Sequence, residues 1–311
     1  MNVALITTCT NRKQGSVSEA LDFANVSVGG QSQVCKTWAQ SVVDAPNIRE
    51  AQDTYCGRGF QEAKATSRVL NSGFHVISAG LGLVPSFTKI PAYNATLSKS
   101  STNCIARKVN SAFDPGSWWQ QLNKITDWGF SLSTIVHDTN IDLILLTLTS
   151  TYVPLVLGDL EALSPKHAEK VRIIGLRSKE LLPEHLKSSL MPYDERFDGP
   201  DGKRRGTRSD FPQRATRQFA EELLSVTPQA SRSLHAETVQ EYLANMRFPT
   251  VVTRKKMTDD EIISTIKKHW FDASGNSSKM LRLFRDSLLI ACEEKRFSIL
   301  FNQVRKQGLN T

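Results

Sequence analysis

The run Ile141–Leu148, which reads IDLILLTL, is the feature that most constrains the fold, because a strand this apolar has to be covered on both faces. Such burial is typical of the centre of a parallel sheet with helices on each side. Three further runs have strand character, and segments with helical character lie between them. The strand-like runs are 3–7, 75–78 and 171–176, and the helical segments are 34–44, 59–72 and 116–125. This alternation predicts an α/β fold with a mostly parallel central sheet flanked by helices.

The positive charge of the chain is concentrated in its last third. Residues 201–311 hold 20 Lys and Arg against 13 Asp and Glu, while residues 1–200 hold 19 against 18. This composition favours a polyanion such as nucleic acid as partner, although a merely solvated basic surface has the same composition. The sequence has neither an apolar run of membrane-spanning length nor a secretory leader, so we expect a cytoplasmic protein. Five widely spaced cysteines indicate reduced thiols, and we expect neither a metal nor a cofactor.

Polar loops follow several of the predicted strands. In the segment 74–96 a strand-like run is followed by a loop that contains Gly80 and Gly82. Because these glycines have no Cβ atom, a ligand could approach the backbone of the loop closely. The block Asp53–Phe60 precedes a helix, and Thr8–Lys13 follows the first strand. Ligands of open α/β sheets bind at the carboxyl ends of the strands, so we expect these loops and the exit of the long apolar strand to enclose one pocket.

Four sequence blocks occur in order over roughly the first 220 residues: LITTCTNRK, DTYCGRGF, VISAGLGLVPSFTKIPAYNATL and GTRSDFPQRATRQF. They resemble a family of bacterial phage-defence proteins related to the uracil-DNA-glycosylase and tRNA-guanine-transglycosylase-associated α/β domains. Within it they resemble the glycosylases that remove glucosylated hydroxymethylcytosine from phage DNA. The resemblance implies a uracil-DNA-glycosylase-like catalytic domain over 1–225 that acts on double-stranded DNA. The motif Gly-Gln-Asp-Pro-Tyr-His, which activates water in uracil glycosylases, does not occur in the sequence, so the identity of the water-activating residue stays open.

Hydrolysis of an N-glycosidic bond needs a group that places water, a group that stabilises the positive sugar, and donors against the departing base. Asn11 stands where uracil-glycosylase relatives have an Asp or Asn, so the resemblance implies that Asn11 orients the attacking water. Asp53 beside Tyr55 is the candidate catalytic pair, and Asp210 is the reserve carboxylate. The predicted base pocket consists of Cys9, Ser78, Gly80, Gly82, Leu83 and Tyr93. Each tyrosine has core packing as its alternative, since aromatic rings are readily buried.

Cations close to these loops are candidates for phosphate contacts. The segment 203–217 holds six cations against one acid and opens a helix, which is a suitable phosphate cradle. An arginine beside a carboxylate is equally explained by a structural ion pair, and Asp210 by simple helix capping. The predicted DNA contacts in this part of the chain are Arg12, Lys13, Arg58, Arg208 and Arg214.

Residues 226–311 are predicted to form a separate basic helical module. Thr258–Glu261 has the pattern of a capping box that opens an amphipathic helix to Trp270. A short helix over 279–285 and a longer one over 289–306 complete a unit with the proportions of a helix-turn-helix module. The predicted DNA contacts in this module are Lys279 and Arg282.

Together these patterns predict a DNA glycosylase that flips a modified base out of double-stranded phage DNA and leaves an abasic site. Two alternatives remain open. A base-exchange or deoxyribosyl-transfer enzyme would use Asp53 or Asp210 as a nucleophile toward the sugar. A non-catalytic sensor would bind nucleic acid or nucleotide in the same pocket without breaking a bond.

Overall fold

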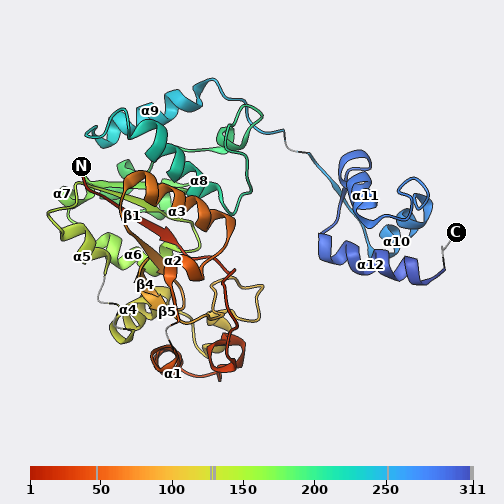
Figure 1. Cartoon of the computed structure of the whole chain (residues 1–311), viewed down its shortest axis with the longest axis horizontal. Coiled ribbons are helices and arrows are strands. Elements are labelled where there is room, and N and C mark those ends of the chain that lie inside the picture. The colour runs from red at the N-terminus through yellow and green to blue at the C-terminus, as the bar shows by residue number, and fades with distance from the viewer. Residues whose placement is uncertain (47, 127, 129–130, 251, 309–311) are drawn as a thin grey trace. The chain divides into compact units, whose positions relative to one another are not determined.

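The structure, a computed structural model, describes residues 1–46, 48–126, 128, 131–250 and 252–308. The chain divides into two compact units, Met1–Pro249 and Thr250–Thr311 (Figure 1). The boundary suggested by the sequence, at 225 and 226, falls in front of helix α9 (Arg232–Ala244). This helix belongs to the first unit because Val239 and Leu243 are buried in that unit's core.

The first unit is built on a five-stranded sheet with the strand order β4-β3-β1-β6-β7. The strands are β1 (Val3–Thr8), β3 (Phe74–Ser78), β4 (Gly82–Pro85), β6 (Leu143–Thr147) and β7 (Val171–Ile174). Four of them run parallel, and the edge strand β4 pairs antiparallel with β3. Every residue of β1 and β6 is buried, as strands covered on both faces require. The predicted α/β fold with a mostly parallel central sheet is confirmed.

Helices cover both faces of this sheet (Figure 1). On one face α3 (Arg58–Leu70) packs against α8 (Phe211–Gln218), which continues as a π-helix over Phe219–Leu223. The other layer consists of α1 (Gln31–Asp44), α4 (Pro115–Ile125) and α6 (Val153–Glu161). Shorter elements are α2 (Ala51–Thr54), α5 (Leu132–His137), α7 (Pro165–Ala168) and the ladder of β2 (Arg49–Glu50) with β5 (Lys89–Ile90). No helix of the described residues has the length and apolarity needed to cross a membrane.

The strand order places a topological switch point between β1 and β6. The chain passes from β1 to β3 on one side and later returns to β6 on the other side. α3, in the connection from β1 to β3, and α6, in the connection from β6 to β7, cover opposite faces of the sheet (Figure 1). The loops leaving β1 and β6 therefore separate, and a crevice opens at the carboxyl ends of the two strands.

The glycine-containing turn after β3 closes a buried hairpin with β4. Gly82 has φ +79°, in the left-handed region that favours glycine. Three indole N–H groups donate to the carbonyls of this turn at 2.7 to 2.8 Å; the pairs are Trp38 with Gly80, Trp118 with Ala79 and Trp128 with Leu81. The carbonyls of the turn thus bind tryptophan side chains of the protein itself.

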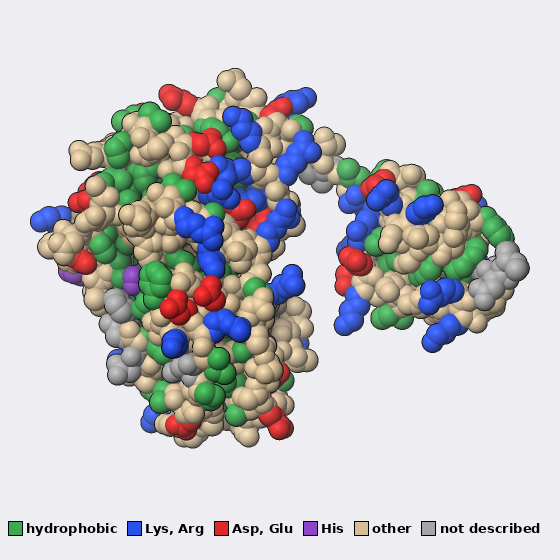
Figure 2. Space-filling model, in the orientation of Figure 1, with side chains coloured by type: hydrophobic (Ala, Val, Ile, Leu, Met, Phe, Trp, Pro, Cys, Tyr) green, Lys and Arg blue, Asp and Glu red, His purple; other side chains and the backbone are tan. Residues whose placement is uncertain are grey.

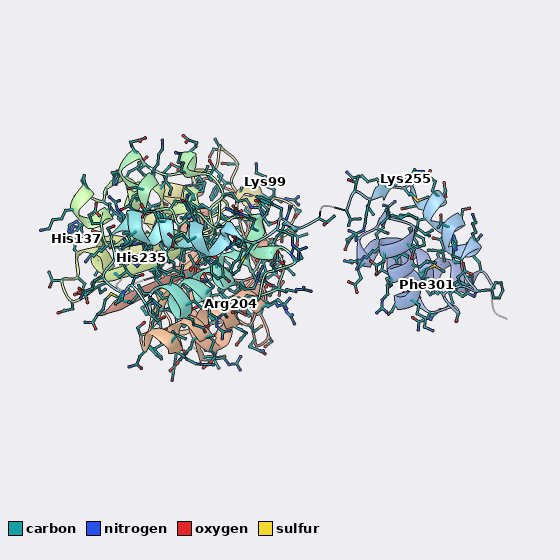
Figure 3. All side chains as sticks on the ribbon, turned by 90° about the horizontal axis from the view of Figure 1, so that it is seen from above. Lys99, His137, Arg204, His235, Lys255 and Phe301 are labelled. Carbon is teal, nitrogen blue, oxygen red and sulfur yellow. The ribbon has the colours of Figure 1, made fainter. Side chains whose placement is uncertain are left out.

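Within residues 252–308, the second unit has three α-helices and its own core. They are α10 (Asp259–Lys268), α11 (Ser277–Arg282), which continues as a π-helix to Ser287, and α12 (Glu294–Lys306). The capping box of Thr258 and Glu261 is present as predicted, and the buried Phe301 lies among the helices (Figure 3). The helix expected from residue 289 begins only at Glu294, because β9 (Ile290–Ala291) pairs in parallel with β8 (Lys255–Lys256).

Candidate functional site at the switch point

A cavity of about 650 Å³, here called the switch-point cavity, opens at the carboxyl ends of β1 and β6. Its volume lies within the range of about 300 to 1,000 Å³ that small-molecule sites occupy. Its walls come from five separate stretches of the chain, mostly with hydroxyl, amide or guanidinium side chains. They are Thr8–Arg12, Gly57–Gly59, Thr96–Ser98, Thr149 with Thr151 and Tyr152, and Thr207 with Ser209, Asp210 and Gln213.

Three helices begin at this cavity. The N-cap residues of α3, α6 and α8 are Gly57, Tyr152 and Asp210, and all three line it. None of these N-caps makes a side-chain capping hydrogen bond. Because the N-terminal end of a helix carries partial positive charge and free N–H groups, three such ends create a site that favours an anion or a developing negative charge.

Asp210 is the one carboxylate among the described residues that line the cavity. Its side chain is 2% exposed and accepts a hydrogen bond from Arg214 Nε at 2.6 Å and from the Thr207 N–H at 2.7 Å. Arg58 Nε lies 3.5 Å away. Burial by itself would raise the pKa of Asp210, but the hydrogen bonds from Arg214 and Thr207 outweigh it and lower the pKa below its ordinary value. Asp210 is therefore an anion at neutral pH.

Gln213, in the first turn of α8, contributes an amide to the cavity wall. Its Nε2 donates to Thr8 Oγ1 at 3.3 Å, and its buried Oε1 has no hydrogen-bond partner among the described residues. A Cβ at Gly59 would come within 2.9 Å of that oxygen, so α3 approaches α8 as closely as glycine permits. A buried amide oxygen without a partner, in a cavity wall, is free to bind a donor on a ligand.

Cys9 and Tyr152 meet on the cavity wall, where Cys9 Sγ lies 3.1 Å from Tyr152 Oη. Burial, followed by the effect of Cys9, raises the pKa of Tyr152 well above its ordinary value, so the phenol stays protonated. Tyr152 therefore presents an aromatic ring and a hydroxyl to the cavity, a combination suited to stacking on a base.

Several predicted site residues meet in this cavity. Asn11 and Arg12, both exposed, follow β1 and line it, as does Cys9. Arg58 lines it from the first turn of α3 with a side chain that is 63% exposed. Exposed Arg208 stands between two lining residues, Thr207 and Ser209.

Other predicted residues lie in the core. The hydroxyl of Tyr93 lies 2.8 Å from that of Tyr55 and 2.6 Å from Ser78 Oγ, and all three side chains are buried. Ser78 Oγ also accepts from the N–H groups of Gly80 and Leu81. The predicted base-pocket residues that do not line the cavity are Ser78, Gly80, Gly82, Leu83 and Tyr93. Their polar groups are engaged within the fold: the Leu83 N–H, for example, donates to Asn123.

Three further predicted residues make structural contacts. Asp53 forms an ion pair with Lys64 at 2.9 Å and does not line the cavity. Lys13 Nζ lies 4.1 Å from the ring centroid of Tyr93, and burial lowers its pKa. The side chain of Arg214 is 2% exposed and pairs with Asp198 as well as Asp210, so its guanidinium group is engaged by carboxylates of the protein itself. Lys279 and Arg282 lie on α11 of the second unit.

Tyr152 and Gln213 line the cavity but are not among the site residues predicted from the sequence. Tyr152 lies at the exit of the predicted apolar strand 141–148, and Pro154, which suits the first turn of a helix, is the sequence signal for its position. Gln213 carried no such signal, since its place beside Thr8 depends on a contact across 205 positions of sequence. Among the described residues, His, Cys, Asp and Glu form no group of three able to hold a metal ion.

Comparison of the chain with protein-family models gave no match, and comparisons with curated proteins and with solved structures gave no significant match.

Proposed function

We propose that the first unit is a DNA glycosylase that binds an extruded nucleotide in the switch-point cavity and hydrolyses the bond between its base and its deoxyribose. The proposed substrate is double-stranded phage DNA, and the proposed base, from the sequence resemblance, is glucosylated hydroxymethylcytosine. The product is an abasic site, and the proposed role is defence against phage. The proposed catalytic domain is uracil-DNA-glycosylase-like.

One observation supports this proposal most: a single cavity brings together an amide, an ionised carboxylate and an aromatic ring. They are Asn11, Asp210 and Tyr152, which come from three distant segments. Arg12 and Arg58 stand at the same cavity with exposed side chains, where phosphates flanking an extruded nucleotide would lie. An extruded base needs these groups together, since it is held by stacking and edge hydrogen bonds while its backbone is held by cations.

The chemistry divides between Asn11 and Asp210. As the bond to the base lengthens, C1′ of the sugar gains positive charge, which the Asp210 carboxylate stabilises at short range in a buried setting. Asn11 holds the attacking water through its amide oxygen. The oxygen of water bonds to C1′, the electron pair of the broken bond leaves with the base, and the proton of water follows it. The helix N-termini stabilise the base as it departs with negative charge, and Gln213 Oε1 accepts a hydrogen bond from an N–H donor on the base.

The second unit is proposed to add affinity for duplex DNA, with a helix-turn-helix-like arrangement of α10, α11 and α12. It holds 12 Lys and Arg against 7 Asp and Glu over residues 250–311, so five of the eight net positive charges lie there. A surface of this charge releases counterions when it meets a polyphosphate.

The test incubates the full-length protein with three matched duplexes that carry cytosine, hydroxymethylcytosine or glucosylated hydroxymethylcytosine, followed by alkali and a gel. We expect strand breaks at the glucosylated base only. Asn11→Ala is expected to slow single-turnover excision by roughly 100-fold, the lower range for loss of a proton-transfer or water-placing group. If the folded protein binds duplex DNA but excises no base, the enzyme proposal is wrong and the non-catalytic sensor is favoured.

The role of Asp210 is tested by Asp210→Asn, which changes the carboxylate that lines the cavity. Its matched control is Asp53→Asn, which changes a carboxylate outside the cavity. We expect Asp53→Asn to excise within about twofold of the wild-type rate, and Asp210→Asn to lose most activity, because one group stands beside the reacting sugar and the other does not. Circular dichroism and the melting temperature show whether each variant is folded. Equal loss in the two variants would remove the role assigned to Asp210.

The position of Asp210 also favours a second candidate, base exchange or deoxyribosyl transfer. A carboxylate kept ionised in the cavity is able to attack C1′ and form a covalent sugar ester, which a different base then resolves. Incorporation of an added labelled free base into the DNA, in place of an abasic site, distinguishes this reaction from hydrolysis.

A further inference from the structure

A second cavity, here called the cationic cavity, lies in the C-terminal unit along the β8–β9 ladder and has a volume of about 400 Å³. Arg254, which directly precedes β8, and Lys256, the last residue of β8, both line it. Arg285 reaches the cavity from the middle of the π-helix, and Arg296 from the first turn of α12. The remaining lining residues are Ile290, Ala291, Cys292 and Glu293.

Arg296 is the one of these four cations that has a carboxylate partner among the described residues. Arg296 Nε binds Asp259 at 2.7 Å, and Arg254 Nε donates to the backbone carbonyl of Arg285 at 3.0 Å. The side chains of Lys256 and Arg285 have no carboxylate partner among the described residues. Glu293 is the one acid in the described lining. Like charges gathered in a hollow repel one another, and a bound anion relieves that repulsion.

The backbone adds to this positive field. α12, a helix of 13 residues, begins beside the cavity, and its N-cap Glu293 makes no side-chain capping hydrogen bond. The partial positive charge of this helix end is therefore directed at the same place as the cations. Figure 2 shows Lys and Arg side chains at several places on this face of the unit, some of them beside Asp and Glu, and Lys255 lies at the surface in Figure 3.

We propose that the cationic cavity binds phosphodiester groups of the DNA backbone and anchors the C-terminal unit on duplex DNA. Guanidinium groups suit this ligand, because their planar fork matches the two free oxygens of a phosphate. The choice of DNA over another polyanion rests on the proposed function of the first unit. The anchoring set then differs from the one expected from sequence, since Lys279 and Arg282 do not line the cavity.

The experiment measures binding of an unmodified duplex to full-length protein by fluorescence anisotropy over a range of salt concentrations. The test variant is Lys256→Gln/Arg285→Gln, whose side chains make no hydrogen bond to lose among the described residues. The control is Lys267→Gln/Lys268→Gln, two exposed lysines at the end of α10 that do not line the cavity, and it removes the same charge from the same unit. Each neutralised phosphate contributes about 0.9 to the slope of log K against log salt.

We expect the test variant to bind at least tenfold more weakly and to lose about 2 from the salt slope, while the control stays within about twofold of wild type. Glu293→Gln, which removes the acid from the cavity, is expected to tighten binding. Wild-type affinity in the test variant, or equal loss in the control, overturns the proposal. So does binding to vesicles rich in phosphatidylserine without binding to the duplex. A protein that binds duplex through this cavity yet excises no base refutes the proposed function alone.

Discussion

Asp210 and Arg214 form an ion pair one helical turn apart, with Arg214 Nε 2.6 Å from Asp210 Oδ1 and both side chains 2% exposed. The pair holds the Asp210 carboxylate at the cavity wall. In the proposed reaction this carboxylate stabilises the positive charge that develops on the sugar. Arg214 also donates to the carbonyls of Arg204 and Thr207, so the arginine ties the basic segment to α8. A buried charge held in this way is fixed in position, and its loss is costly.

Replacing one partner of this pair should destabilise the first unit. Arg214→Met leaves Asp210 buried without its main donor, and we expect the free energy of unfolding to fall by about 3 kcal/mol or more. Urea unfolding followed by tryptophan fluorescence reports this unit, because four of the five tryptophans lie in it. The double variant Asp210→Asn/Arg214→Met should recover part of the loss. A change below about 1 kcal/mol in Arg214→Met would contradict the assignment.

The alternation of strands and helices could be predicted because each buried strand carries its own signal, as in the uniform run of β6. The hairpin after β3 could not. The sequence pattern of a glycine-containing turn is the same whether the turn faces a ligand or the protein core. Its actual partners, Trp38, Trp118 and Trp128, lie about 40 residues or more away along the chain. Asp53 and Asp210 likewise look equivalent as carboxylates beside arginines, and only the packing of α8 beside α3 brings Asp210 into the cavity.

His75 should make the stability of the protein depend on pH in mildly acidic solution. Burial lowers the pKa of His75 from 6.5 to about 4 in the folded protein. Between about pH 6.5 and 4 the unfolded chain therefore binds a proton that the folded protein excludes, so stability falls as the pH falls, by at most about 1.4 kcal/mol per pH unit. We expect His75→Gln to flatten the profile of urea midpoints over this window. A His75→Gln profile as steep as that of the wild type between about pH 6.5 and 4 would contradict this prediction.

Replacing Gly59 by alanine should destabilise the protein, although Gly59 lies in a helix, where alanine is intrinsically favoured over glycine by about 1 kcal/mol. The added atom would lie 2.9 Å from Gln213 Oε1 and 3.4 Å from Asp210 Cα, so we expect Gly59→Ala to lower stability by about 1 to 3 kcal/mol. In a Gln213→Ala background the same change should cost much less, since the amide is gone. Gly30→Ala, with no atom within 4 Å of its Cβ, is the control. Equal costs in the two backgrounds would refute the close contact.

Tyr152 should contribute to excision through its ring more than through its hydroxyl. Stacking of a base on an aromatic side chain contributes about 1 to 3 kcal/mol, whereas the hydroxyl's neighbour, Cys9 Sγ, is a weak hydrogen-bonding group. We therefore expect Tyr152→Phe to excise within about threefold of wild type and Tyr152→Ala to lose about tenfold or more in single-turnover rate or substrate affinity. Tyr55→Phe is the matched control in the core and should leave substrate affinity unchanged, because its ring does not line the cavity. If Tyr152→Phe and Tyr152→Ala are equally impaired, the hydroxyl and not the ring carries the function, and the stacking role assigned to Tyr152 is wrong.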